Sequence, residues 1–243
     1  MRFEVAGAAD VSAEAIDVRV DLSNVGDSAA ESLSVEGELL GSRAQARLAR
    51  VPAGTSRSVS LRFPANAARS GVHALTLLLD YTPQGPGSVS VSQRAYLLFG
   101  LGATTEPAVR LGVPNVSMGW VGTLVVQLES ADAAAHRVRL RVATPRWLRA
   151  ESPSSEVEVP ASGKTLAPVR LFRGTAPWGS RQGVVVVAEA TDGDLARTTV
   201  ATGVVEIRSD PAWMPHLRQP LLLLAVLLLA GALLAEWRQR RAA

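Results

Sequence analysis

Residues 162–165 read SGKT, which is similar to the end of a phosphate-binding loop. Such a loop cradles phosphate oxygens with backbone N–H groups and needs a glycine five positions before the glycine of that motif. Glu158 stands at this position instead. The segment also repeats residues 53–55, AGT, between two strand-like stretches. We therefore expect a strand-to-strand turn and no nucleotide site.

Metal and catalytic sites need clustered ligands or paired nucleophiles, and the sequence offers neither. The chain has no cysteine, and its three histidines, His73, His136 and His216, have no partner at metal-ligand spacing. Residues 192–194, DGD, lack the third carboxylate of a calcium loop and are typical of a hairpin turn. No serine lies in a G-x-S-x-G elbow. We expect no metal, no cofactor, no catalytic residue and no enzyme.

Three tryptophans, Trp120, Trp147 and Trp178, are the remaining candidates for binding a ligand or partner. An exposed loop tryptophan can stack on a sugar ring or anchor a partner protein. Trp178 lies in the turn-rich stretch GTAPWGSRQG. The alternative is that each tryptophan packs as a lid on the core or at a contact between domains.

Charge is nearly balanced along the chain. Lys and Arg number 25 against 22 Asp and Glu, which gives a net charge of +3. A nucleic-acid-binding domain concentrates basic residues on one face. The sequence shows no such concentration, so we expect no nucleic acid partner.

The first 208 residues contain a tandem repeat, which indicates two similar structural units. The matching segments, in chain order, are residues 15–27 with 122–134, 51–63 with 159–172, and 71–82 with 183–194. In both units apolar residues alternate with polar ones. Ile16, Val18 and Val20 alternate with Asp17 and Arg19, and a stretch of the second unit has the same pattern, with Arg137, Arg139 and Arg141 between Val138, Leu140 and Val142.

A period of two indicates antiparallel sheets with one solvated face. About seven strands per 100 residues is typical of an immunoglobulin-like sandwich. We predict an all-β fold, namely two tandem immunoglobulin-like β-sandwiches followed by one C-terminal transmembrane α-helix. The first sandwich is expected at residues 1–100, a linker at 101–108 and the second sandwich at 109–208.

The turn signals give each unit a family resemblance. The first unit resembles the CARDB class of adhesion-related domains of bacteria and archaea, and the second resembles the NEW3-type domain. The matching features are Asn24 and Gly26, the Pro52–Gly54 turn and Asp80-Tyr81 in the first unit, and Pro145-Arg-Trp147, the Pro160–Gly163 turn and Gly183 in the second. The second unit has Ser130-Ala-Asp132 where the first has Asn24-Val-Gly26. The resemblance implies a binding or scaffolding role at the cell envelope.

The chain also contains a candidate membrane anchor. From Pro220 to Ala235 the sequence is apolar and uncharged. As a helix these residues would measure about 24 Å, somewhat less than the ~30 Å core of a bilayer. Trp213 and Trp237 flank the stretch at positions suited to the two membrane interfaces. We predict a transmembrane helix at residues 217–237, with the lipid bilayer as a partner.

Flanking charges predict the orientation of this helix. Arg238, Arg240 and Arg241 lie in a basic tail, 238–243, which the positive-inside rule assigns to the cytoplasm. The sandwiches and a juxtamembrane stalk at 209–216 would then be extracytoplasmic, in the periplasm or at the cell surface. The first ten residues have no apolar signal-peptide core. We favour a missing signal; a start further upstream or a tail-anchored protein facing the cytoplasm are the alternatives.

Two main hypotheses for function follow. The first is a single-pass membrane protein whose sandwiches act in adhesion, as a scaffold or as a binding module for a protein or glycan. The second is an accessory subunit of a transport or secretion complex, docked through the helix. Gly231 and Ala235 form a small-xxx-small pair suited to contact with another membrane helix. A hydrolase with a site built from distant loops is a third alternative.

Overall fold

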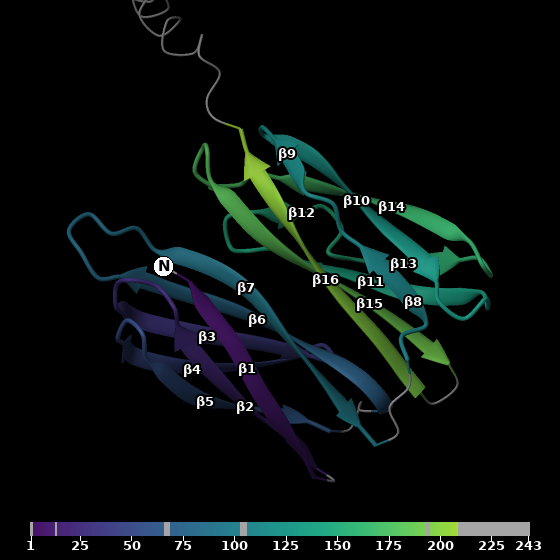
Figure 1. The fold of residues 1–243 in the computed structure, drawn as a ribbon, viewed down its shortest axis with the longest axis horizontal. Helices are drawn as coiled ribbons and strands as arrows, with labels where there is room; N and C mark the ends of the chain where they lie inside the picture. Colours follow the sequence, from purple (N-terminus) through teal and green to yellow (C-terminus); the bar gives the residue numbers. More distant parts are fainter. Residues whose placement is uncertain (1, 13, 66–68, 103–105, 193–194, 209–243) are drawn as a thin grey trace, which may run out of the picture. The chain divides into compact units, whose positions relative to one another are not determined.

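The computed structural model describes residues 2–12, 14–65, 69–102, 106–192 and 195–208 (Figure 1). All regular elements in these ranges are β-strands, which confirms the all-β prediction. In the same ranges no helix is long and apolar enough to cross a membrane. The predicted stalk at 209–216, transmembrane helix at 217–237 and tail at 238–243 lie outside the described residues.

The first half of the chain forms seven strands. They are β1 (Phe3–Val11), β2 (Ala15–Asn24), β3 (Ala30–Leu39), β4 (Ser42–Val51), β5 (Ser56–Pro64), β6 (Ser70–Pro83) and β7 (Val91–Leu101). One sheet has the order β1-β2-β5, and the facing strands have the order β7-β6-β3-β4. Ile16, Val18 and Val20 are buried while Asp17 and Arg19 are exposed. The alternation of β2 therefore places its apolar side chains in a core shared by the two sheets.

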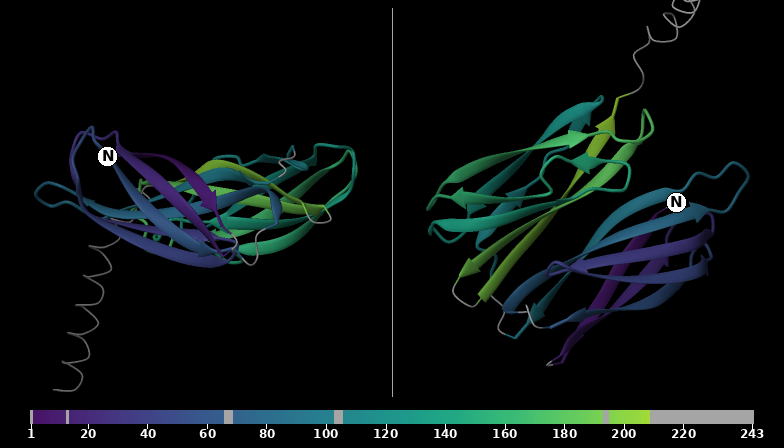
Figure 2. Two further views of the ribbon diagram at one scale, coloured as in Figure 1. Left: turned by 90° about the horizontal axis from the view of Figure 1, so that it is seen from below. Right: turned by 180° about the vertical axis from the view of Figure 1, so that it is seen from behind.

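The second half repeats this architecture with nine strands. They are β8 (Val109–Gly112), β9 (Val116–Met118), β10 (Val121–Ser130), β11 (His136–Ala143), β12 (Arg149–Ala150), β13 (Ser154–Val159), β14 (Lys164–Phe172), β15 (Arg181–Asp192) and β16 (Leu195–Ile207). One sheet has the order β12-β14-β10-β8, and β13-β11-β15-β16 faces it (Figure 2). A second apolar core lies between these sheets, with Leu124, Leu140 and Val186 fully buried.

The two halves share one sheet, because β16 pairs in parallel with β6 at Leu195–Ser70 and Ala196–Gly71. A small third cluster lies beside this pairing, where Ala74 of β6 packs with Val185 and Val187 of β15. Met1–Ile207 form one compact unit by their contacts. The predicted division into domains at residues 101–108 stays a prediction, and residues 103–105 lie outside the described ranges.

Candidate functional site: a polar groove and an aromatic cluster

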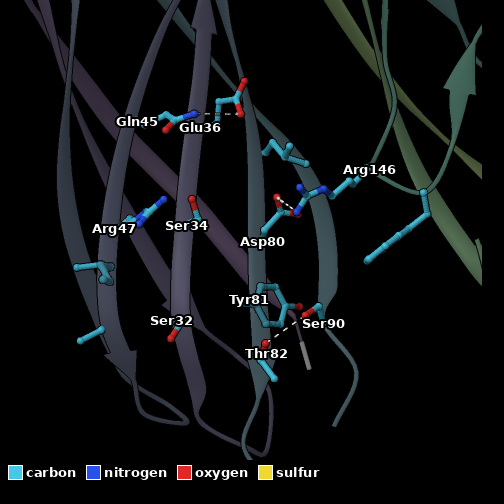
Figure 3. Close-up of a pocket in the computed structure, with 14 residues that line it drawn as sticks. Ser32, Ser34, Glu36, Gln45, Arg47, Asp80, Tyr81, Thr82, Ser90 and Arg146 are labelled. Carbon is cyan, nitrogen blue, oxygen red and sulfur yellow. Dashed lines mark hydrogen bonds and ion pairs between the residues drawn. The ribbon is translucent and has the colours of Figure 1, made fainter. Parts of the chain in front are cut away.

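A polar groove of about 780 Å³ lies on the outward face of the first half (Figure 3). The neighbouring strands β4, β3 and β6 form its base, and the loop after β11 contributes Arg146 and Trp147. Its polar lining consists of Ser32, Ser34, Glu36, Gln45, Arg47, Asp80, Thr82, Ser90 and Arg146. The groove therefore offers hydroxyl, amide, carboxylate and guanidinium groups on one surface.

Strand alternation explains why β3 contributes polar side chains to the groove. Leu33 and Val35 are fully buried, so Ser34 and Glu36 must face outward. The register between β3 and β6 shifts between Glu31 and Ser34, which marks a β-bulge. Ser32 lies at this bulge with a positive φ of 51°. A bulge re-aims side chains locally, and here it adds the Ser32 hydroxyl to the groove.

Several groove side chains already interact with one another. The guanidinium of Arg146 lies 4.0 Å from the Asp80 carboxylate, and Gln45 donates a hydrogen bond to Glu36 at 3.5 Å. Arg47, opposite Ser34 in the β3–β4 register, makes no ion pair within the described part of the chain. Arg47 therefore has its charge available for a ligand.

Tyr81 forms part of the floor of the groove. Its side chain is 2% exposed and its ring packs edge-on against Phe3, with centroids 5.0 Å apart. Burial raises the pKa of the Tyr81 hydroxyl. The floor is thus held by the core of the first half, while the polar rim faces solvent.

The arrangement suits hydrogen bonding to a polar ligand. Hydroxyls and amides donate and accept, whereas Arg47 and Arg146 donate to carboxylate or carbonyl oxygens. Among the described residues no group of three or more His, Cys, Asp and Glu side chains is placed to hold a metal ion.

The structure separates the three tryptophans that the sequence singled out. Trp147 is partly buried against the second core and lines the polar groove. Trp120 and Trp178 instead meet edge to face, with ring centroids 5.2 Å apart. The Arg173 guanidinium stacks on both, 4.1 Å from the Trp120 ring and 4.0 Å from the Trp178 ring. The second half therefore has an aromatic cluster distinct from the groove.

The structure also places other residues that the sequence singled out. Gly163 lies in the turn between β13 and β14, where its N–H donates to the Pro160 carbonyl at 3.1 Å, as predicted for a turn. His73 is 3% exposed, with Nε2 2.7 Å from the Arg69 carbonyl oxygen. Outside the described residues lie Trp213, Gly231, Ala235, Trp237, Arg238, Arg240, Arg241, His216 and the Gly193-Asp194 pair.

Sequence reasoning missed Arg173 and most of the groove. Arg173 and Trp120 are far apart in the sequence, and the fold brings them together. The Arg173 backbone N–H donates to the Trp120 carbonyl at 2.9 Å, at the point where β14 ends and β10 begins. For the groove, the signal was the run of polar residues at outward positions of β3. That signal has the same form as an ordinary solvated face.

No protein-family model matches the chain, and no curated protein is significantly similar to it. Solved structures share a distant likeness. Red sea bream transglutaminase is 16% identical with a TM-score of 0.29, over 86% of this chain and 32% of the transglutaminase. A protein of unknown function from Porphyromonas gingivalis W83 is 18% identical with a TM-score of 0.34, over 84% of this chain and 99% of the other.

Trypsin-activated alpha-2-macroglobulin from Escherichia coli is 9% identical with a TM-score of 0.34, over 86% of this chain and 18% of the macroglobulin. The chain thus spans about a third of the transglutaminase and less than a fifth of the macroglobulin.

Proposed function

We propose that the protein is a membrane-anchored, extracytoplasmic binding or scaffold module of the cell envelope. In this proposal its two halves are immunoglobulin-like domains of the CARDB and NEW3 types, and its apolar segment at 217–237 is the anchor. The polar groove of the first half binds a protein segment or a glycan. The observation that carries the binding role is the groove itself, a set of outward polar groups on a rigid sheet.

Three features of the groove support this role. Its base is a sheet backed by the first apolar core, so the polar groups are held in fixed positions. Its rim includes the exposed cation Arg47 beside Ser34, and Arg47 has no ion pair with any residue that the structure describes. Arg146 and Trp147 add a cation and an aromatic surface, the residue types enriched where binding energy concentrates.

The groove is tested with the full chain in lipid nanodiscs, titrated against envelope glycans and against peptides from envelope proteins. We expect Arg47→Ala to weaken binding about tenfold, because a lost charge-assisted hydrogen bond corresponds to ~1.4 kcal/mol. Arg57→Ala is the matched control, since Arg57 is also an exposed arginine but lies on β5 of the other sheet. Equal losses in both variants would contradict a role for the groove.

The anchor is tested separately by membrane fractionation. The full chain should remain with membranes after alkaline carbonate washing, and deletion of residues 217–237 should release it. Protease added outside the cell should cut the first 208 residues and spare the basic tail. Stoichiometric co-purification with polytopic proteins would instead favour the accessory-subunit hypothesis.

A further inference from the structure

The cluster of Trp120, Arg173 and Trp178 presents a cation between two indole rings at one end of the second half. Arg173 Nη1 donates to the Ala176 carbonyl at 3.0 Å, which fixes the guanidinium in place. Within the described residues Arg173 forms no ion pair, and its buried Nε has no hydrogen-bond partner. Its charge is therefore held by aromatic rings and one carbonyl rather than by a carboxylate.

The Trp120 side of this cluster is open to solvent, whereas Trp178 is partly buried against the second core. Trp120 is 59% exposed and the adjacent Val121 is 44% exposed. Pro177, in the loop that carries Trp178, is also exposed. Glu206, an acidic residue near the end of β16, is paired with Arg181 at 3.8 Å. The end of the second half thus combines exposed apolar surface with a cation, Arg173, that is paired with no acidic residue of the described ranges.

The same loop holds the point where the chain leaves the sandwich. The Ile207 N–H donates to the Ser180 carbonyl at 2.8 Å, and the Gly179 N–H donates to the Ile207 carbonyl at 2.9 Å. From there, residues 208–219 separate the end of β16 from the apolar stretch that begins at Pro220. Twelve residues reach at most about 40 Å when fully extended. If that stretch is anchored in a bilayer, the end of β16 lies within this reach of the membrane surface, and the loop that carries Trp178 is hydrogen-bonded to that end.

Tryptophan and arginine are suited to that surface. Indole rings prefer the headgroup level, where an apolar body and a polar N–H are both accommodated. Arginine donates paired hydrogen bonds to phosphate oxygens. A sugar ring stacks on an open indole face, and Arg173 already covers one of the two faces of each ring, which reduces the surface for such stacking. The combination favours lipid headgroups over a glycan.

We infer that Trp120, Arg173 and Trp178 form a docking surface for phospholipid headgroups of the membrane that holds the anchor. The inference rests on the proposed anchoring, and it adds a second membrane contact that sets how the second half meets the bilayer. Trp120 and Val121 enter the headgroup layer, and Arg173 faces the phosphates.

The absence of cysteine from the sequence makes the contact measurable. Thr175→Cys places one thiol in the exposed loop beside Trp178, and Leu166→Cys places one at a residue of β14 that is 62% exposed and lies away from this end. Each full-length variant is labelled with an environment-sensitive fluorophore and reconstituted into phosphatidylcholine–phosphatidylglycerol vesicles. Headgroup spin-labelled lipid should quench the label at position 175 and spare the label at position 166.

Trp120→Ala in the Thr175→Cys background should lower the docked-to-undocked ratio about tenfold, which corresponds to ~1.4 kcal/mol. Leu166→Ala in the same background is the control for loss of an exposed apolar side chain, and it should leave quenching unchanged. Because Trp120 is exposed, the far-ultraviolet circular dichroism spectrum should not change.

Vesicle flotation distinguishes the two proposals. A chain that does not float with vesicles overturns the anchor and, with it, the docking surface. A chain that floats without quenching at position 175 overturns the docking surface alone. Equal quenching at positions 175 and 166, quenching unaffected by Trp120→Ala, or capture of a protein through Trp120 in place of lipid contact would overturn it as well.

Discussion

The turn after β2 in the first half and the turn after β10 in the second half are closed by different side chains. In the first half, the Asn24 side chain is 1% exposed and its Nδ2 donates to the carbonyls of Ser28, Val51 and Pro52 at 2.9, 3.1 and 3.3 Å. Its Oδ1 accepts the Gly26 N–H at 3.1 Å. One neutral amide therefore ties this turn to the neighbouring one.

In the second half, two residues, Ser130 and Asp132, make the hydrogen bonds that hold the corresponding turn. Ser130 Oγ donates to the Ala134 carbonyl at 2.8 Å, and Asp132 Oδ1 accepts the Ala134 N–H at 3.2 Å. The Asp132 carboxylate also interacts with His136 Nε2 at 2.5 Å and with the Arg197 guanidinium at 2.8 Å. The backbone bonds correspond, since the Asn24 N–H donates to Thr55 and the Ser130 N–H donates to Gly163. The same backbone turn is thus held by neutral hydrogen bonds in one half and by charge in the other.

The largest expected effect comes from removing the buried amide. Asn24→Ala removes a buried donor shared by three backbone carbonyls, so we expect the free energy of unfolding to fall by about 3 kcal/mol. Ser130→Ala removes one hydrogen bond and should cost about 1 kcal/mol. Urea denaturation of the full chain in mild detergent measures both. Equal costs would show that the two turns depend on their side chains to the same degree.

Gly71 and Gly183 occupy corresponding positions in the repeat, so they allow a second comparison of the two halves. Gly71 has a φ of 126°, and a Cβ there would collide with the Ala196 backbone in the pairing between β6 and β16. A Cβ on Gly183 would meet nothing within 4 Å. We expect Gly71→Ala to cost about 2 kcal/mol, and Gly183→Ala to change the free energy of unfolding by less than about 0.5 kcal/mol. Thermal unfolding of both variants tests this, and a tolerated Gly71→Ala would contradict the pairing.

The smallest expected effect is on the stability of the fold at acidic pH. The hydrogen bond from His136, aided by the Ala134 N–H and Arg197, lowers the pKa of Asp132 from 3.8 to about 2. A lowered pKa stabilises the fold above pH 3.8, and the contribution is lost as the pH falls from 3.8 toward 2. Asp132→Asn should therefore flatten the pH dependence of the unfolding midpoint in this window. Asn24→Ala should leave the pH dependence of the midpoint unchanged. A flatter pH dependence in Asn24→Ala, but not in Asp132→Asn, would contradict the assignment of this pH dependence to Asp132.

The alternation of two strands and several turns followed from the sequence because they are local properties. The alternation around Ile16 and Val18 predicted which face of β2 is buried, and the structure confirms it. The Pro160–Gly163 turn was predicted from its correspondence in the repeat with the Pro52–Gly54 turn, and the structure confirms a turn there. The alternation around Arg141 was less informative. It predicted a wet face, whereas Arg141 is 17% exposed and paired with Glu189 at 2.5 Å and Glu38 at 3.3 Å.

The sequence by itself determined the all-β character and which side chains of the alternating stretches in β2 and β11 are buried, because side-chain direction along a strand alternates with every residue. Only the tertiary structure decided that Arg141 of β11 meets Glu38 of β3, and that Arg173 lies between Trp120 and Trp178. These contacts join residues far apart in the chain, and strand periodicity says which face a side chain is on but not what that face meets. The polar groove and the aromatic cluster depend on that second piece of information.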